Sequence, residues 1–173
     1  AACHVVAVTQ ADAQAIGQLT ATPVSGVGNG VASRAFSTVS ADPQGQRLLF
    51  VGNYEYAPNL DAVQWLLDEI FPRVWLQCPG ARLAVAGYGL PEHWRERWPD
   101  ERIEWQGFVP DLSALQRRCA GFVAALRHGG GSKLKVLEAM AAGLPLVSTA
   151  QGVSGLAVEA HAHYLAGESA EAL

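Results

Sequence analysis

Residues 122–149 read FVAALRHGGGSKLKVLEAMAAGLPLVST, and this stretch decides the fold class. The short apolar run 122–126 is typical of a buried strand, and three glycines separate it from a helical pattern over 132–142. A Gly-Leu-Pro sequence then ends the helix, and a second apolar run, 146–149, follows. A strand, a helix and a second strand with short connections predict a βαβ unit, in which the two strands are parallel.

The rest of the chain repeats this alternation in both directions. The expected strands are 47–51, 83–86, 103–105 and 163–165, and the expected helices are 59–70, 91–98 and 111–119. We therefore predict the α/β class, with a Rossmann-like parallel sheet and helices on both faces. Ligands bind such sheets at the C-terminal ends of the strands, where glycine and asparagine residues gather in this sequence.

Composition excludes several classes of protein. The chain has 173 residues, of which 50% are hydrophobic and 16% charged, enough apolar material for a sizeable core. Its net charge of −4 argues against a nucleic-acid binder, which would normally be basic. No apolar run approaches the roughly 18 residues that a membrane-spanning helix needs, so we expect a soluble chain. The three cysteines lie far apart and predict a reducing compartment.

The three glycines at 129–131 and the helix that follows them predict an anion site. Successive glycines let backbone N–H groups face a ligand without interference from a Cβ, and the helix N-terminus adds partial positive charge. Lys133 and Lys135 lie in the first helical turn, where the helix dipole disfavours cations, so a bound phosphate would compensate them. For the glycines alone, a flexible turn without a ligand is the alternative.

Glu138 is the second candidate for ligand binding. At about 100° per residue it shares an arc with Leu134, Leu137 and Ala141, and we expect that arc to face the sheet. A carboxylate there needs a partner, and it can accept two hydrogen bonds from a vicinal diol such as a ribose. The alternative is a structural acid paired with Lys135. The glycines and the acid together, in one strand–loop–helix unit, favour a ligand.

Other ligand-binding motifs are not matched. The order Ser132 to Leu134 lacks the hydroxyl that a Walker loop places after its lysine. The sequence after Gly87-Tyr88-Gly89 departs from the dinucleotide motif, because position 92 is Glu. His161 and His163 have no evident third ligand, so we expect no metal.

The run from Gly131 to Thr149, which contains Lys135 and Leu137-Glu138-Ala139-Met140-Ala141, closely resembles the C-terminal domain of retaining glycosyltransferases of family 4, also called group 1. Shorter matches extend over nearly the whole chain: Val8-Thr9-x-x-Asp12, Asn29-Gly30-Val31, Phe50-Val51-Gly52 with Pro58-Asn59, Gly107-Phe108-Val109-Pro110-Asp111 and Gly152-x-x-Gly155-Leu156. The resemblance implies a GT-B fold, in which two Rossmann-like domains enclose the active site and the C-terminal one binds the donor. It implies a glycosyltransferase whose donor substrate is a nucleotide-diphosphate-sugar and which needs no cofactor.

The resemblance also carries donor-binding residues over by position. These are Glu138 for the ribose, the backbone of Gly130, Gly131, Ser132 and Lys133 for the diphosphate, and Phe108 and Val109 for the base. Two positions depart from the family pattern. Many members have a second Glu eight residues before the matched one, where this chain has Gly130, and many have Arg and Lys in the loop that begins here with Asn53. Asn53 therefore joins the expected donor site, and Lys133 or Lys135 would carry more of the phosphate charge.

Residues 1–46 read as a strand, a helix, a strand and a polar connection, too little to form a core. We expect them to be the tail of a preceding N-terminal domain plus a linker, and 47–173 to be the nucleotide-sugar-binding domain, truncated at its C-terminus. The catalytic residues are then unknown from this chain, because most would lie in the missing N-terminal domain. That domain, a nucleotide-sugar and a glycan or lipid-linked acceptor are the expected partners.

We expect a cytoplasmic enzyme of polysaccharide biosynthesis, and we leave open whether the full-length protein docks at the inner face of the membrane. Two other functions stay open. The departures at Gly130 and Asn53 motivate a catalytically inactive GT-B-like module for nucleotide binding or assembly. A sugar-nucleotide epimerase of the same fold is the second, although its active-site carboxylates and histidines are not evident.

Overall fold

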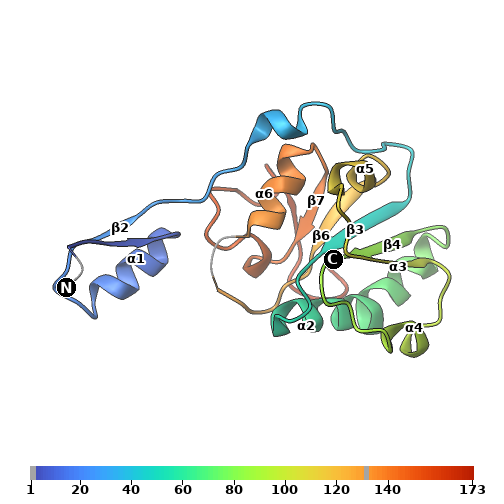
Figure 1. The fold of residues 1–173 in the computed structure, drawn as a ribbon. Coiled ribbons are helices and arrows are strands. Elements are labelled where there is room, and N and C mark those ends of the chain that lie inside the picture. The colour runs from blue at the N-terminus through green and yellow to red at the C-terminus, as the bar shows by residue number, and fades with distance from the viewer. Residues whose placement is uncertain (1–2, 131–132) are drawn as a thin grey trace.

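The computed structural model of the protein describes residues 3–130 and 133–173. Its main feature is a six-stranded parallel sheet in the order β5-β4-β3-β6-β7-β8 (Figure 1). The strands are β3 (Arg47–Val51), β4 (Arg82–Ala86), β5 (Ile103–Gly107), β6 (Gly121–Ala124), β7 (Leu146–Ser148) and β8 (Leu165–Ala166). The predicted parallel sheet is confirmed. The strand order reverses between β3 and β6, which is where open sheets of this kind bind ligands.

Helices cover both faces of this sheet, as predicted for the α/β class. They are α2 (Ala57–Trp65), α3 (Phe71–Gln77), α4 (Trp94–Arg97), α5 (Leu112–Gln116) and α6 (Leu134–Ala141). A π-helical turn, η2 (Leu66–Ile70), joins α2 to α3, and a 3-10 turn, η3 (Gln151–Val153), follows β7. Within residues 3–130 and 133–173, no helix is both long and apolar enough to cross a membrane.

The strands divide their side chains between two cores. Phe50 of β3 and Val85 of β4 are fully buried in the core beneath α2, η2 and α3. Leu49 and Ala84, one residue earlier in each strand, are fully buried in the opposite core with residues of α5 and α6. Because successive side chains of a strand point to opposite faces, unbroken apolar runs bury both faces of the sheet.

The N-terminal segment forms a smaller unit of its own. Strands β1 (Val5–Ala7) and β2 (Val24–Gly26) pair in parallel, and α1 (Gln10–Gly17) connects them. Thr9 caps α1, since its hydroxyl accepts a hydrogen bond from the Asp12 N–H at 3.0 Å. Figure 1 shows this unit set to one side of the six-stranded sheet.

The segment after β2 returns to the main sheet. A 3-10 turn, η1 (Ser33–Phe36), contacts α6, and Val39 is buried in the core on the α5–α6 side. The Asp42 N–H then donates to the Cys119 carbonyl at 2.9 Å. The polar connection before β3 is therefore packed against the domain that follows it.

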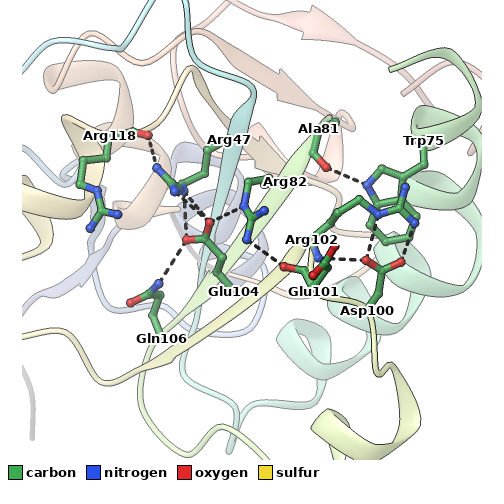
Figure 2. Close-up of polar contacts among 10 residues, drawn as sticks. All are labelled: Arg47, Trp75, Ala81, Arg82, Asp100, Glu101, Arg102, Glu104, Gln106 and Arg118. Carbon is green, nitrogen blue, oxygen red and sulfur yellow. Dashed lines mark hydrogen bonds and ion pairs between the residues drawn. The ribbon is translucent and has the colours of Figure 1, made fainter. Parts of the chain in front are cut away.

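Ion pairs connect β3, β4 and β5 near the ends where these strands begin (Figure 2). Arg47 opens β3 and its guanidinium donates to both oxygens of Glu104, with its closest contact at 2.9 Å. Arg82 opens the neighbouring β4 and its Nε donates to Glu104 Oε1 at 2.7 Å. Burial on its own would raise the pKa of Glu104, but the hydrogen bonds from the two arginines outweigh it, and the pKa is lowered.

Gln116, at the end of α5, buries a polar group without satisfying it. Its side chain is 1% exposed, and Oε1 has no hydrogen-bond partner in the described part of the chain. Because an unsatisfied buried acceptor is costly, we expect Gln116→Met to raise the free energy of unfolding by about 1 kcal/mol. Urea denaturation of both proteins measures this change. A loss of stability would show that the amide is satisfied in solution.

Candidate functional site

Two adjoining cavities lie at the C-terminal ends of the strands. The first, of about 260 Å³, opens at the β3–β6 switch point, and among its lining residues are Asn53, Asn59, Gly130, Lys133 and Lys135. The second, of about 240 Å³, lies over the ends of β3, β4 and β5 and is lined in part by Gly87, Tyr88, Phe108 and Val109. Val51, Gly52 and Asn53 line both cavities. The structure thus brings together Asn53, Gly130, Lys133, Lys135, Phe108 and Val109, six of the predicted site residues.

The structure does not place the other three predicted site residues, Gly131, Ser132 and Glu138, in either cavity. Gly131 and Ser132 lie outside the described residues. Glu138 is half-buried on α6 and does not line either cavity as described.

The Lys133 side chain forms hydrogen bonds with the backbone of the glycines that precede it. It occupies the N-cap position of α6 and is 7% exposed. Its ammonium donates to the carbonyls of Gly129 at 3.1 Å and Gly130 at 2.9 Å. Burial lowers its pKa. These bonds explain how a lysine is accommodated at a helix start, where the dipole disfavours it.

Lys135 lies on the floor of the first cavity. Its Nζ donates to Asn59 Oδ1 at 2.6 Å and lies 4.4 Å from the centre of the Phe50 ring. Burial lowers the pKa of Lys135 to about 7, and the positive charge of Lys133 adds to the effect. An anion bound in the cavity would favour the ammonium form and raise that pKa again.

Asn59 lines this site, although the sequence does not single it out as a ligand-binding residue. The sequence indicates only the start of a helix there and a short Pro-Asn match. The side chain is buried, at 8% exposure, and its Nδ2 donates to the Asn53 carbonyl at 2.8 Å. The available signal was a polar residue in the first turn of a helix that follows a glycine-ended strand.

The predicted orientation of Glu138 is wrong. The buried residues of α6 are Val136 and Ala139, and Ala142 follows them on the same face. The arc that was expected to face the sheet points away from it, and Leu134 in that arc is 48% exposed. Small alanines let the helix approach the sheet closely, whereas the spacing of the two leucines pointed to the opposite side.

The Lys135 alternative for Glu138 is not realised. Lys135 donates to Asn59, and the Glu138 carboxylate makes no hydrogen bond or ion pair with any residue in 3–130 or 133–173. The Glu138 carboxylate is therefore not committed to another side chain in the described ranges.

A row of glycines forms the floor of the second cavity. The Gly52 N–H donates to the Ala86 carbonyl at 3.0 Å, and the Gly87 N–H donates to the Gly107 carbonyl at 2.7 Å. Gly87 has a φ of +134°, and a Cβ built on it would lie 1.7 Å from the Gly52 carbonyl oxygen. Above this floor, Tyr88 is 58% and Phe108 71% exposed. The cavity can therefore receive a flat group between backbone and aromatic rings.

The two cavities differ in charge. His128, Lys133 and Lys135 line the first, and no Asp or Glu is found among the described residues that line either one. Asp61 lies nearby, but it pairs with Arg127. No group of three His, Cys, Asp or Glu side chains that could hold a metal occurs in the described ranges. The arrangement suits an anion in the first cavity and a flat ring in the second.

The sequence matches the family described as glycosyl transferases group 1 over residues 45–173. A Klebsiella pneumoniae protein described as an uncharacterized 44.6 kDa protein in the cps region is 30% identical over 116 residues, which are 62% of this chain and 30% of that protein. The matched part thus spans about a third of that relative.

Solved structures share the fold at low sequence identity. HepE of Anabaena, in complex with UDP and glucose, has a TM-score of 0.74 and 18% identity, covering 99% of this chain and 50% of that one. The pneumococcal O-GlcNAc transferase GtfA, in complex with UDP and GlcNAc, has a TM-score of 0.70 and 15% identity, covering 96% of this chain and 34% of that one. This chain therefore spans between a third and a half of these proteins.

Proposed function

The chain belongs to the group 1 glycosyltransferase family, and on this premise we propose that it is the donor-binding part of a retaining glycosyltransferase. The donor is a nucleotide-diphosphate-sugar, and the acceptor is a glycan or a lipid-linked sugar. One observation carries the proposal: a lysine-floored cavity adjoins a cavity bounded by aromatic rings, at the switch point of a parallel sheet. HepE and GtfA, which share this fold, were crystallised with UDP and a sugar, which supports the same class of ligand.

The donor is assigned to the two cavities by chemistry. The diphosphate binds in the first cavity beside Lys135, at the N-terminus of α6 and the loop that contains Gly130, Gly131, Ser132 and Lys133. The base binds in the second, against Phe108 and Val109. Asn53, which lines both, lies between base and diphosphate. Glu138 accepts hydrogen bonds from the ribose hydroxyls.

For the reaction, we propose that the departing diphosphate itself assists the transfer while it is held beside Lys135 in the first cavity. The bond from the anomeric carbon to the phosphate oxygen breaks while the acceptor hydroxyl attacks from the same face, and its proton passes to that phosphate oxygen. Lys135 and the α6 dipole stabilise the developing negative charge.

The N-terminal unit bears on the organisation of the parent protein. In this proposal residues 1–46 are the tail of an N-terminal domain plus the linker, and 47–173 are the donor domain. The exposure of Val6 at 62%, Val27 at 57% and Leu19 at 87% supports it, because so small a two-stranded sheet needs further chain to cover its apolar side chains. That domain would complete the cleft and bind the acceptor. The cps-region relative supports a role in polysaccharide synthesis, which we place at the cytoplasmic side of the membrane.

Calorimetric titration with UDP, GDP and their glucose conjugates tests the donor site. We expect this chain, or the full-length protein, to bind one of these nucleotides, and Glu138→Ala to weaken that binding about tenfold, the effect of losing a hydrogen bond to a charged group. Glu159→Ala, which removes an exposed carboxylate elsewhere, is the matched control and should leave the affinity unchanged. If the full-length protein binds no nucleotide, the donor-site assignment is wrong.

A second function is favoured by the loop after β3. Asn53 and Tyr54 stand where many family members carry a basic pair, which motivates a module that binds nucleotide without transferring sugar. The two functions differ in one measurement. A transferase hydrolyses or transfers the sugar of its donor in the full-length protein, whereas an inactive module binds the nucleotide and leaves the donor intact.

A further inference from the structure

Asn59 connects the two sides of the first cavity. It lies in the first turn of α2, on the β3 side, while Lys135 belongs to α6, on the β6 side. Its amide oxygen accepts from Lys135 Nζ at 2.6 Å, and its amide nitrogen donates to the Asn53 carbonyl at 2.8 Å. One buried side chain thus holds both the loop after β3 and the lysine that reaches it across the switch point.

The backbone around Asn59 leaves room for this amide. A Cβ built on Gly52 would lie 3.0 Å from Asn59 Cβ and Cγ, which is tighter than most contacts that real Cβ atoms make. Glycine at position 52 therefore leaves room for the Asn59 side chain beside it. A buried amide is costly unless it is hydrogen-bonded, so this placement requires the partners that it has.

Among the described residues, Lys135 Nζ has one hydrogen-bond acceptor, Asn59 Oδ1. Its other described neighbour is the Phe50 ring, which attracts a cation but accepts no strong hydrogen bond. The titratable groups near it are Lys133 at the start of α6, His128 in the loop after β6, Tyr56 before α2, and Glu138 one turn further along α6. Of these, only Glu138 could favour the ammonium, and it is not bonded to it. Asn59 Oδ1 is therefore the group in direct contact that stabilises the positive charge.

We propose that Asn59 is a positioning residue of the donor site, which holds Lys135 Nζ on the cavity floor and keeps it as an ammonium for the diphosphate. This inference rests on the proposed function, because it requires that the first cavity receive a diphosphate. Asn59 itself acts through Lys135 and need not touch the donor. It also explains how the site works with Asn53 where relatives place a basic pair, since the charge comes from Lys135 of α6 and Asn59 of α2 supplies its acceptor.

The pH dependence of binding distinguishes positioning from a general structural role. UDP and inorganic pyrophosphate are titrated into the chain at several pH values between about 5.5 and 9, a window that brackets the lowered pKa of Lys135. Because the diphosphate binds the ammonium form, the wild-type affinity should fall as the pH rises above the pKa of Lys135, approaching tenfold for each pH unit. The pKa itself is followed without ligand by NMR of the Lys135 side chain.

Two substitutions of Asn59 should move this profile in opposite directions. Asn59→Leu removes the acceptor, so the midpoint should shift to lower pH and the affinity at about pH 8 should drop roughly tenfold. Asn59→Asp supplies a negative charge, so the midpoint should shift to higher pH. Either variant is sufficient if the other does not fold. Gln116→Met, which also replaces a buried amide but lies in α5, is the matched control and should leave the midpoint unchanged.

The experiment distinguishes a failure of the inference about Asn59 from a failure of the proposed function. If the wild type binds UDP or pyrophosphate and the folded Asn59 variants keep its midpoint and its Lys135 titration, the inference about Asn59 is overturned and the donor site stands. If the full-length wild type binds neither ligand at any pH, the proposed function falls, and the inference falls with it.

Discussion

Replacing Gly87 with alanine is expected to destabilise the domain by about 4 kcal/mol or more, a large part of the total stability of a small domain. The added Cβ would lie 1.7 Å from the Gly52 carbonyl oxygen, and both partners are backbone atoms that no side-chain rotation can separate. The φ of +134° is also one that alanine rarely adopts. Thermal and urea unfolding measure the loss, and nucleotide binding should disappear with it, because the second cavity rests on this contact.

Gly107→Ala is the matched control for this experiment. Gly107 also has a positive φ, of +63°, but a Cβ there would meet no atom within 4 Å. The expected cost is therefore only the conformational one, about 1–2 kcal/mol. Equal losses from the two substitutions would contradict the close contact between the ends of β3 and β4.

Replacing Glu104 with glutamine is expected to lower the stability by about 2–3 kcal/mol at neutral pH. The change keeps the shape of the side chain but leaves Arg47 and Arg82, which open neighbouring strands, without a negative charge between them. Glu104 is only 14% exposed in its side chain, so water cannot replace the lost interaction fully. Urea denaturation of both proteins measures the difference.

The effect of Glu104 should depend on pH with a definite sign. Because the pKa of Glu104 is lowered in the folded protein, its contribution is complete above the unfolded pKa of about 4.3. It is lost as the pH falls through the lower folded value, so wild type and Glu104→Gln should converge in acid. Glu101→Gln, an exposed neighbour, should change stability by less than about 0.5 kcal/mol. A difference that persists in acid would contradict an ionic origin.

The order of strands and helices could be predicted because its signals are local. The apolar runs that became β3, β4 and β6 are buried on both faces, which an unbroken run indicates. Thr9 and Asp111 are of the residue types that favour helix caps, and both side chains accept hydrogen bonds from helical N–H groups. Glycines at strand ends likewise predicted where a ligand could approach the backbone, and both cavities lie there.

The orientation of α6 could not be predicted in the same way. Leu134, Leu137 and Ala141 are as apolar as the residues that face the sheet, so the spacing of apolar residues alone did not identify the buried face. Shape decides the matter, because Val136 and Ala139 fit against the strands and leave Glu138 at the boundary. The expected orientation of Glu138 was wrong, and its binding of a ribose stays a prediction.

The sequence by itself determined the α/β class, the order of the elements, the family and the glycine loop, since each depends on neighbouring residues or on a contiguous motif. Only the tertiary structure decided which groups meet in the site. Lys135 and Asn59 are 76 positions apart, and their hydrogen bond exists because β3 and β6 pair at the switch point of the sheet. The bonds from Lys133 are different, because they reach carbonyls only three and four residues earlier in the chain. Burial lowers the pKa of both lysines, and burial is a property of packing, which no local pattern records.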